Sequence, residues 1–263
     1  MNFFLLTAKR VIASLLTHNV IGKLIGWVMR DQIPAFGLRI GTQDPAVSAH
    51  VKAKLFFGIY ESAERRFVSK YLPIDVHVVE FGSSLGVLTC LIRKRLPENL
   101  KVVAVEANPN LVPILKNNLA VNGCVNNVFI EAAAVSYQPG CQALFQQSVH
   151  STDGRLAPNS LADGSVAVPA IKLSDILRTY RLDDFSLVCD IEGAEWEIFE
   201  NDLSSLEKAK VIIIELHKSA KGQNSNALLN QILASGQFVL VDQYGPTCVL
   251  SPTTQSSSRE QVR

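Results

Sequence analysis

The sequence predicts an α/β protein with a doubly wound, mostly parallel seven-stranded sheet and an N-terminal helical extension. From about residue 73, short apolar runs alternate with stretches of helical periodicity, which is the pattern of strand–helix–strand units. The run VIIIELH at 211–217 is apolar enough for a central strand that is covered on both faces. With 263 residues, of which 48% are hydrophobic and 19% charged, the chain is long enough for one sizeable domain and an appendage.

The first half of the predicted domain contains three strands that alternate with two helices. The second helix has Pro109 in its first turn and Gly123 just beyond its last turn, where a left-handed residue commonly ends a helix. The strands are expected at 76–81, 101–107 and 127–135, and the helices at 85–96 and 109–122.

The second half begins with an irregular stretch, 137–170, which is punctuated by glycine and proline and is interpreted as a strand-and-loop insertion. Such a loop either shapes a substrate pocket or is a plain surface excursion. Helices are then expected at 171–180, 192–202 and 224–234, and strands at 186–191, 211–217, 237–243 and 247–251, the last two as an antiparallel pair. The predicted organisation is a helical extension at 1–70, the main domain at 71–251 and a polar, disordered tail at 252–263.

Residues 1–30 have the spacing of amphipathic helices. Basic residues interrupt the segment before any apolar run is long enough to span a bilayer, and no small-residue cleavage site of a signal peptide is present. Two interpretations stay open: packing on the main domain or a partner subunit, as in a dimer, and peripheral contact with a membrane surface.

The composition argues against nucleic acid as a partner, because the formal net charge is only +1 and no basic run is present. The five cysteines are scattered, without a C-x-x-C pair or zinc-ligand spacing, and are interpreted as reduced thiols of a cytoplasmic protein.

Acidic residues follow or end four of the predicted strands. In an open parallel sheet the ligand crevice lies outside the carboxyl ends of the strands, so these side chains are expected to face one crevice. Their mutual repulsion is a cost that a ligand or cation offsets. The residues are Glu80, Glu106, Asp190 with Glu192, and Glu215 with His217.

The loop after the first strand differs from a dinucleotide-binding loop. The motif G-x-G-x-x-G needs three glycines, but from Gly82 the chain reads GSSLGV, with Ser84 and Val87 at the second and third positions. Glu80 would repel a pyrophosphate and suits an ammonium group. Glu106, at the end of the second strand, stands where an acid commonly accepts both ribose hydroxyls. A ligand with an ammonium group and a ribose but no pyrophosphate describes S-adenosylmethionine.

Five segments together resemble, in order and spacing, the FkbM family of S-adenosylmethionine-dependent methyltransferases. The resemblance covers roughly residues 73–251, and it implies a class I, Rossmann-like fold and O-methylation of a sugar hydroxyl on a glycan or glycosylated metabolite. The family more often has another residue, such as lysine, at Cys189, and the segment 146–168 has no close match, so the acceptor does not carry over. The segments are EFGSSLG at 80–86, EANP at 106–109, KLSDIL at 172–177, DIEGAE at 190–195 and IELH at 214–217.

The resemblance and the chemistry together assign the site residues. An acidic residue or His217 is expected to take the proton of the acceptor, and Glu215, two residues earlier on an extended strand, to orient the imidazole. The candidate catalytic residues are Asp190, Glu192 and His217. The candidate cofactor-binding residues are Glu80, Phe81, Gly82, Ser83, Ser84, Gly86, Glu106, Ala107, Asn108, Ala133 and Asp190.

Three alternatives stay open. A divalent cation held by Asp190, Glu192 and Glu215 is compatible with their oxygen ligands but is not favoured. The enzymatic rival is an NAD(P)-dependent oxidoreductase, which the two missing glycines and Glu80 disfavour. The third is a non-catalytic nucleoside-binding or scaffold protein that keeps the fold without turnover.

Overall fold

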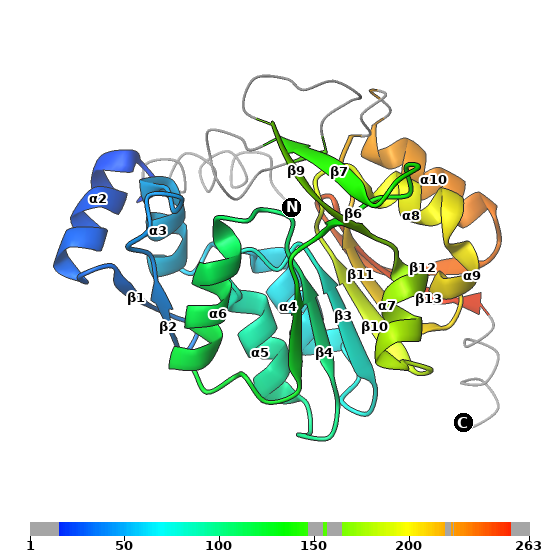
Figure 1. Ribbon diagram of the computed structural model, residues 1–263, viewed down its shortest axis with the longest axis horizontal. Coiled ribbons are helices and arrows are strands. Elements are labelled where there is room, and N and C mark those ends of the chain that lie inside the picture. Colours follow the sequence, from blue (N-terminus) through cyan, green and yellow to red (C-terminus); the bar gives the residue numbers. More distant parts are fainter. Residues whose placement is uncertain (1–15, 147–154, 157–164, 219–221, 223, 254–263) are drawn as a thin grey trace, which may run out of the picture.

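The structure is a computed structural model that describes residues 16–146, 155–156, 165–218, 222 and 224–253 (Figure 1). Its centre is a seven-stranded sheet in which β13 runs antiparallel to both of its neighbours and the other strands are parallel. This confirms the predicted α/β fold and the closing antiparallel pair. In sheet order the strands are β12 (Phe238–Tyr244), β13 (Thr247–Pro252), β11 (Ala209–Glu215), β10 (Phe185–Cys189), β3 (His77–Phe81), β4 (Val102–Val105) and β5 (Val128–Glu131).

The strand order reverses beside β3. From β3 the chain proceeds outward through β4 to β5 and then returns to place β10 on the other side of β3. In open α/β sheets, the connections that leave two such strands run to opposite sides, and ligands bind in the crevice outside the carboxyl ends of these strands. The functional site is therefore expected beyond Phe81 and Cys189, the last residues of β3 and β10.

Helices cover both faces of the sheet. Successive side chains of a strand point to opposite faces, so a strand that is apolar throughout buries side chains on both. Val79 and Phe81 of β3 pack in one core with α7, α8, α9 and α10, whereas Val78 packs in another with α4 and α5. The helices are α4 (Ser62–Tyr71), α5 (Val87–Arg95), α6 (Leu111–Val121), α7 (Leu173–Tyr180), α8 (Glu195–Asn201), α9 (Leu203–Leu206) and α10 (Ser225–Ala234). Among the helices of the described residues, none is both long and apolar enough to cross a membrane.

The described part of the N-terminal extension contains a hairpin in addition to helices (blue in Figure 1). The hairpin turns at Phe36 and Gly37, both of which have positive φ, and it packs with α2, α3, α5 and α6 in a separate hydrophobic cluster. The sequence did not indicate these two strands. The elements are α2 (Asn19–Val28), β1 (Gln32–Ala35), β2 (Leu38–Gly41) and α3 (Ala49–Phe56). Residues 1–15 and the tail from 254 lie outside the described residues.

The insertion predicted at 137–170 contains strands, as expected. They form a small sheet in the order β6 (Ala134–Val135), β9 (Ser165–Ile171), β7 (Gln142–Gln146) and β8 (Arg155–Leu156). Residues 133–135 and Phe145 contribute to the cavity described below, so this sheet borders the site rather than standing apart on the surface.

Candidate active site

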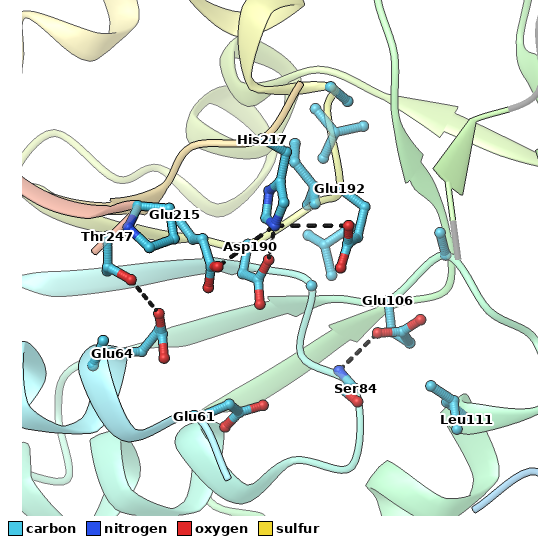
Figure 2. A pocket seen from close by; sticks show the side chains of 18 of the residues that line it. Glu61, Glu64, Ser84, Glu106, Leu111, Asp190, Glu192, Glu215, His217 and Thr247 are labelled. Atoms are coloured by element: carbon cyan, nitrogen blue, oxygen red, sulfur yellow. Dashed lines mark hydrogen bonds and ion pairs between the residues drawn. The ribbon is translucent and has the colours of Figure 1, made fainter. Parts of the chain in front are cut away.

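A cavity of about 390 Å³ lies beyond the carboxyl ends of β3, β4, β10 and β11. Its size falls within the range of about 300–1,000 Å³ that is usual for small-molecule sites. The walls come from the loops after these strands, from the segment between α3 and α4, from the small sheet and from the turn between β12 and β13. Figure 2 shows its acidic side chains converging on the same space.

Gly82 lies where the loop after β3 passes the end of β10. Its φ is +81°, and an added Cβ would come within 1.8 Å of the carbonyl oxygen of Asp190. Only glycine fits this close approach, and it lets the backbone form part of the cavity wall. Ser84, at the second glycine position of a dinucleotide motif, also has positive φ. The loop therefore keeps a backbone conformation that is usual for glycine, but it carries a side chain at this position.

Glu106 follows β4 and is held by two backbone amides. Ser84 N donates to its Oε2 and Asn108 N to its Oε1, both at 2.7 Å. Burial raises the pKa of Glu106 to about 6, and these N–H donors act in the opposite direction. A carboxylate oxygen accepts more than one hydrogen bond, so each has capacity left for a hydroxyl donor in the cavity. The arrangement suits a vicinal diol such as that of a ribose.

Four residues form a cluster on the other side of the cavity: Asp190, Glu192, Glu215 and His217 (Figure 2). His217 Nε2 lies 3.7 Å from Asp190 Oδ1 and 3.6 Å from a carboxylate oxygen of each of the other two. The acids of three of the four predicted strand ends, namely Glu106, Asp190 with Glu192, and Glu215, therefore share one cavity with His217, as expected.

The carboxylate that orients His217 is Glu195 and not Glu215. Glu195 is 0% exposed at the start of α8, and its Oε1 lies 2.8 Å from Nδ1 of the imidazole. The expectation that Glu215 would orient the ring assumed extended backbone through residue 217, but β11 ends at Glu215. The Glu195 contact fixes Nδ1 and directs Nε2 toward the cavity.

The charges of the cluster shift the pKa values of its members. Burial lowers the pKa of His217, but the hydrogen bond and charge of Glu195, together with the charge of Asp190, outweigh it and raise this pKa to about 10. Burial raises the pKa of Asp190 to about 7, against the effect of His217. Burial and the charge of Asp190 raise that of Glu215 to about 8. At neutral pH the cluster is thus an imidazolium among carboxyl groups that share protons.

Asp190, Glu192 and His217 also have ligand atoms within 4.8 Å of one another, which is close enough to bind one cation. Neutral imidazole is the form that binds metals. Because the pKa of His217 is raised to about 10, a divalent cation would have to displace the proton on that ring.

Several of the residues predicted to bind the cofactor do not line the cavity. Glu80 is 2% exposed and, two residues beyond Val78, points to the face of the sheet that α4 and α5 cover. The expectation that Glu80 faces the ligand is therefore not met, and its pKa is raised to about 8 by burial. The others absent from the wall are Phe81, Ser83, Gly86 and Asn108, whereas Gly82, Ser84, Glu106, Ala107, Ala133 and Asp190 are part of it.

Gly86 has a packing function instead. Its φ is +77°, and an added Cβ would lie 2.4 Å from Cδ1 of Leu115 on α6. The glycine thus allows α5 to begin close against α6 and does not approach the ligand space.

The wall also contains residues of the N-terminal extension and of the last hairpin, which the sequence did not single out. Tyr60 Oη lies 3.0 Å from Ser84 Oγ, and Thr247 Oγ1 donates to Glu64 Oε1 at 2.7 Å. Lys54 and Glu61 line the same space. The one signal available in the sequence was the pair Glu61 and Glu64 at the start of a helical segment. Such acids are common on solvent-exposed helices, so they did not indicate a site.

The fold and the site define the class of protein. A sheet with this strand order and one reversed strand, with a carboxylate after its second strand positioned for a ribose and no phosphate-binding glycine loop, is that of a class I, Rossmann-like methyltransferase. The chain belongs to the FkbM methyltransferase family: the model described as "Methyltransferase FkbM domain" matches residues 84–240, more than half of the sequence. No curated protein matches the sequence.

Solved structures resemble the chain at low identity. A putative O-methyltransferase from Klebsiella pneumoniae is 11% identical over 88% of this chain and 96% of its own, with a TM-score of 0.46. A putative tRNA (m1A22) methyltransferase from Streptococcus pneumoniae, in complex with S-adenosyl-L-methionine, is 11% identical over 72% of this chain and 71% of its own, with a TM-score of 0.42. A protein of the NADB-Rossmann superfamily from Streptococcus agalactiae is 15% identical over 73% of this chain and 68% of its own, with a TM-score of 0.43. These similarities concern the fold alone.

Proposed function

We propose that this methyltransferase transfers the methyl group of S-adenosylmethionine to an oxygen atom, with a sugar hydroxyl of a glycan or glycosylated metabolite as acceptor. The observation that carries the choice of cofactor is Glu106, whose two oxygens are fixed by Ser84 N and Asn108 N at the cavity wall. The acceptor class comes from the FkbM family resemblance.

The residues present fit this cofactor. Glu106 would accept the ribose hydroxyls, and Gly82 would bring the backbone close to the chain that joins the ribose to the amino acid. Ala133, in the wall two residues after the end of β5, would lie by the adenine. When bound, the sulfonium supplies an electrophilic methyl group, and its positive charge suits a cavity lined by many carboxylates.

The cluster around His217 would handle the acceptor. Methyl transfer to a hydroxyl requires alignment of the oxygen and removal of its proton. Asp190 suits the second task, because a general base works best with a pKa near the working pH, and its pKa is about 7. The imidazolium of His217, fixed by Glu195, would donate a hydrogen bond from Nε2 and so orient the acceptor oxygen or the Asp190 carboxylate.

The first experiment is calorimetry of the whole chain with S-adenosylhomocysteine and with NAD. We expect binding of S-adenosylhomocysteine at micromolar concentrations and negligible binding of NAD. NAD binding without S-adenosylhomocysteine binding would favour the oxidoreductase alternative and contradict the proposal.

The second experiment addresses turnover. The protein and cofactor labelled in its methyl group are incubated with cell extracts, and the labelled product is identified. We expect a methyl ether on a sugar. Cofactor binding without any labelled product across the extracts would favour the scaffold alternative.

We propose the cytoplasm as the compartment. All five cysteines are free thiols, and four of them, Cys90, Cys124, Cys189 and Cys248, are buried. Fractionation of cells that express the chain tests this assignment.

A further inference from the structure

Glu61, a partly buried residue in the cavity wall, has no task in the chemistry described so far. It precedes the first residue of α4 with a φ of +46°, which is uncommon for residues other than glycine. Its Oε2 is shielded from solvent and has no hydrogen-bond partner. Burial raises the pKa of Glu61 well above its usual range, and the charges of Glu80 and Glu64 add to the rise. A cation in the cavity would relieve this repulsion.

The backbone around Glu61 is fixed. The amides of Ile59 and Tyr60 both donate to the carbonyl oxygen of Lys54, at 2.9 and 3.2 Å. Arg65 of α4 donates from Nε to Tyr60 O and from Nη2 to Gly58 O, each at 2.9 Å. The turn between α3 and α4 therefore presents Glu61 in a defined position, as a preformed binding group does.

Lys54, at the other side of this turn, lines the same cavity. Among the described residues of the cavity wall, it is the only lysine or arginine. The turn folds back on the carbonyl oxygen of Lys54, and both Lys54 and Glu61 line the cavity. A cation and an anion placed in this way suit a ligand end that carries both charges.

A chain of contacts links this turn to the ribose position. Ser84 donates its backbone N–H to Glu106, and its hydroxyl lies 3.0 Å from Tyr60 Oη. Figure 2 shows Ser84 between Glu106 and Glu61 along one wall, with the His217 cluster opposite. Ser84 thus connects the ribose position at Glu106 with the turn that carries Glu61, in the wall of the same cavity.

We propose that Lys54 and Glu61 bind the carboxylate and the ammonium of the amino-acid end of the methyl donor. This assignment rests on the proposed function, since it assumes that the cavity takes S-adenosylmethionine. In this assignment Glu61 binds the ammonium, in place of the buried Glu80. Glu61 lies outside the segment 84–240 that the family model matches.

The test compares two ligands that share a nucleoside and a thioether but differ in the amino-acid end. S-adenosylhomocysteine has this end, and 5′-methylthioadenosine lacks it. Binding of both is measured by calorimetry on the wild type, Glu61→Gln and Lys54→Gln. Glu200→Gln, an exposed position on α8, is the matched control.

We expect each of the two site variants to bind S-adenosylhomocysteine about tenfold or more weakly, as for loss of one charge-assisted hydrogen bond. Their affinity for 5′-methylthioadenosine should equal that of the wild type, which also shows that the variants fold. Glu200→Gln should bind both ligands normally.

Unchanged affinity for S-adenosylhomocysteine in either site variant would overturn the subsite while the proposed function stands. An equal loss of affinity for both ligands would also overturn the subsite, because the effect of the substitution would then not lie at the amino-acid end. If the wild type binds neither ligand, the proposed function itself fails, and the subsite with it.

Discussion

Replacement of Glu80 by glutamine tests how the buried carboxyl group in β3 affects stability. Glu80 is 2% exposed, and its Oε2 has no hydrogen-bond partner. Burial, with a smaller contribution from the charge of Glu106, raises the pKa of Glu80 from 4.5 to about 8. Glutamine has nearly the same shape as the protonated side chain and does not ionise.

The size of the effect follows from this pKa. Because the folded-state pKa is raised, the folded chain binds more protons than the unfolded chain between pH 4.5 and about 8. The stabilisation that the protonated Glu80 carboxyl group contributes is complete below pH 4.5 and is lost as the pH rises to about 8. At about 1.4 kcal/mol per pKa unit, the wild type has lost roughly 3 kcal/mol of unfolding free energy at pH 7. The unfolding free energy of Glu80→Gln should not fall by this amount.

The assay is urea unfolding of the ligand-free chain at a series of pH values from about 5 to about 9. We expect the unfolding free energy of the wild type to fall more steeply with pH than that of Glu80→Gln. Glu98→Gln, at an exposed position, should keep the wild-type slope. The same slope in the wild type and in Glu80→Gln would refute the reasoning.

Three further substitutions test the site and the N-terminal segment. Glu106→Gln should weaken S-adenosylhomocysteine binding about tenfold or more, since it removes a charged acceptor for the ribose hydroxyls; normal affinity by calorimetry would remove Glu106 from the site. Asp190→Asn should bind the same ligand normally but lower the rate of methyl transfer by about 100-fold or more, as for loss of a general base; an unchanged rate with labelled cofactor would show that another group takes the proton. We also propose that the exposed apolar face of α2, where Trp27 is 79% exposed, contacts a membrane surface. Trp27→Glu should then reduce flotation of the chain with anionic liposomes, and wild-type protein that does not float would contradict the contact.

The sequence predicted the parts of the site that depend on sheet geometry. Strands with continuous apolar runs are unambiguous, and the residues that follow parallel strands meet at one edge. Glu106, Asp190, Glu192 and Glu215 were identified for this reason, and the structure places all of them, with His217, in one cavity. Their roles stay predictions.

The sequence failed where a long-range contact decides the outcome. The alternation of side-chain directions, from which Glu215 was paired with His217, ends with β11 at Glu215. Helix α8 brings Glu195 to the imidazole instead. Glu61 precedes β3 along the chain, and only the packing of α4 on the sheet brings it into the wall. The hairpin at 32–41 turns at Phe36 and Gly37, without the Asn-Gly or Asp-Gly pair that typically marks such a turn.

The contact between Thr247 and Glu64 has a consequence for the order in which the site can form during synthesis. These residues are far apart in the sequence, yet they join at 2.7 Å in the cavity wall. A nascent chain that has not yet released residue 247 from the ribosome lacks that part of the wall, even when all the parallel strands have emerged. A ligand that depends on the completed cavity can therefore stabilise only those chains in which residue 247 has already emerged and reached Glu64.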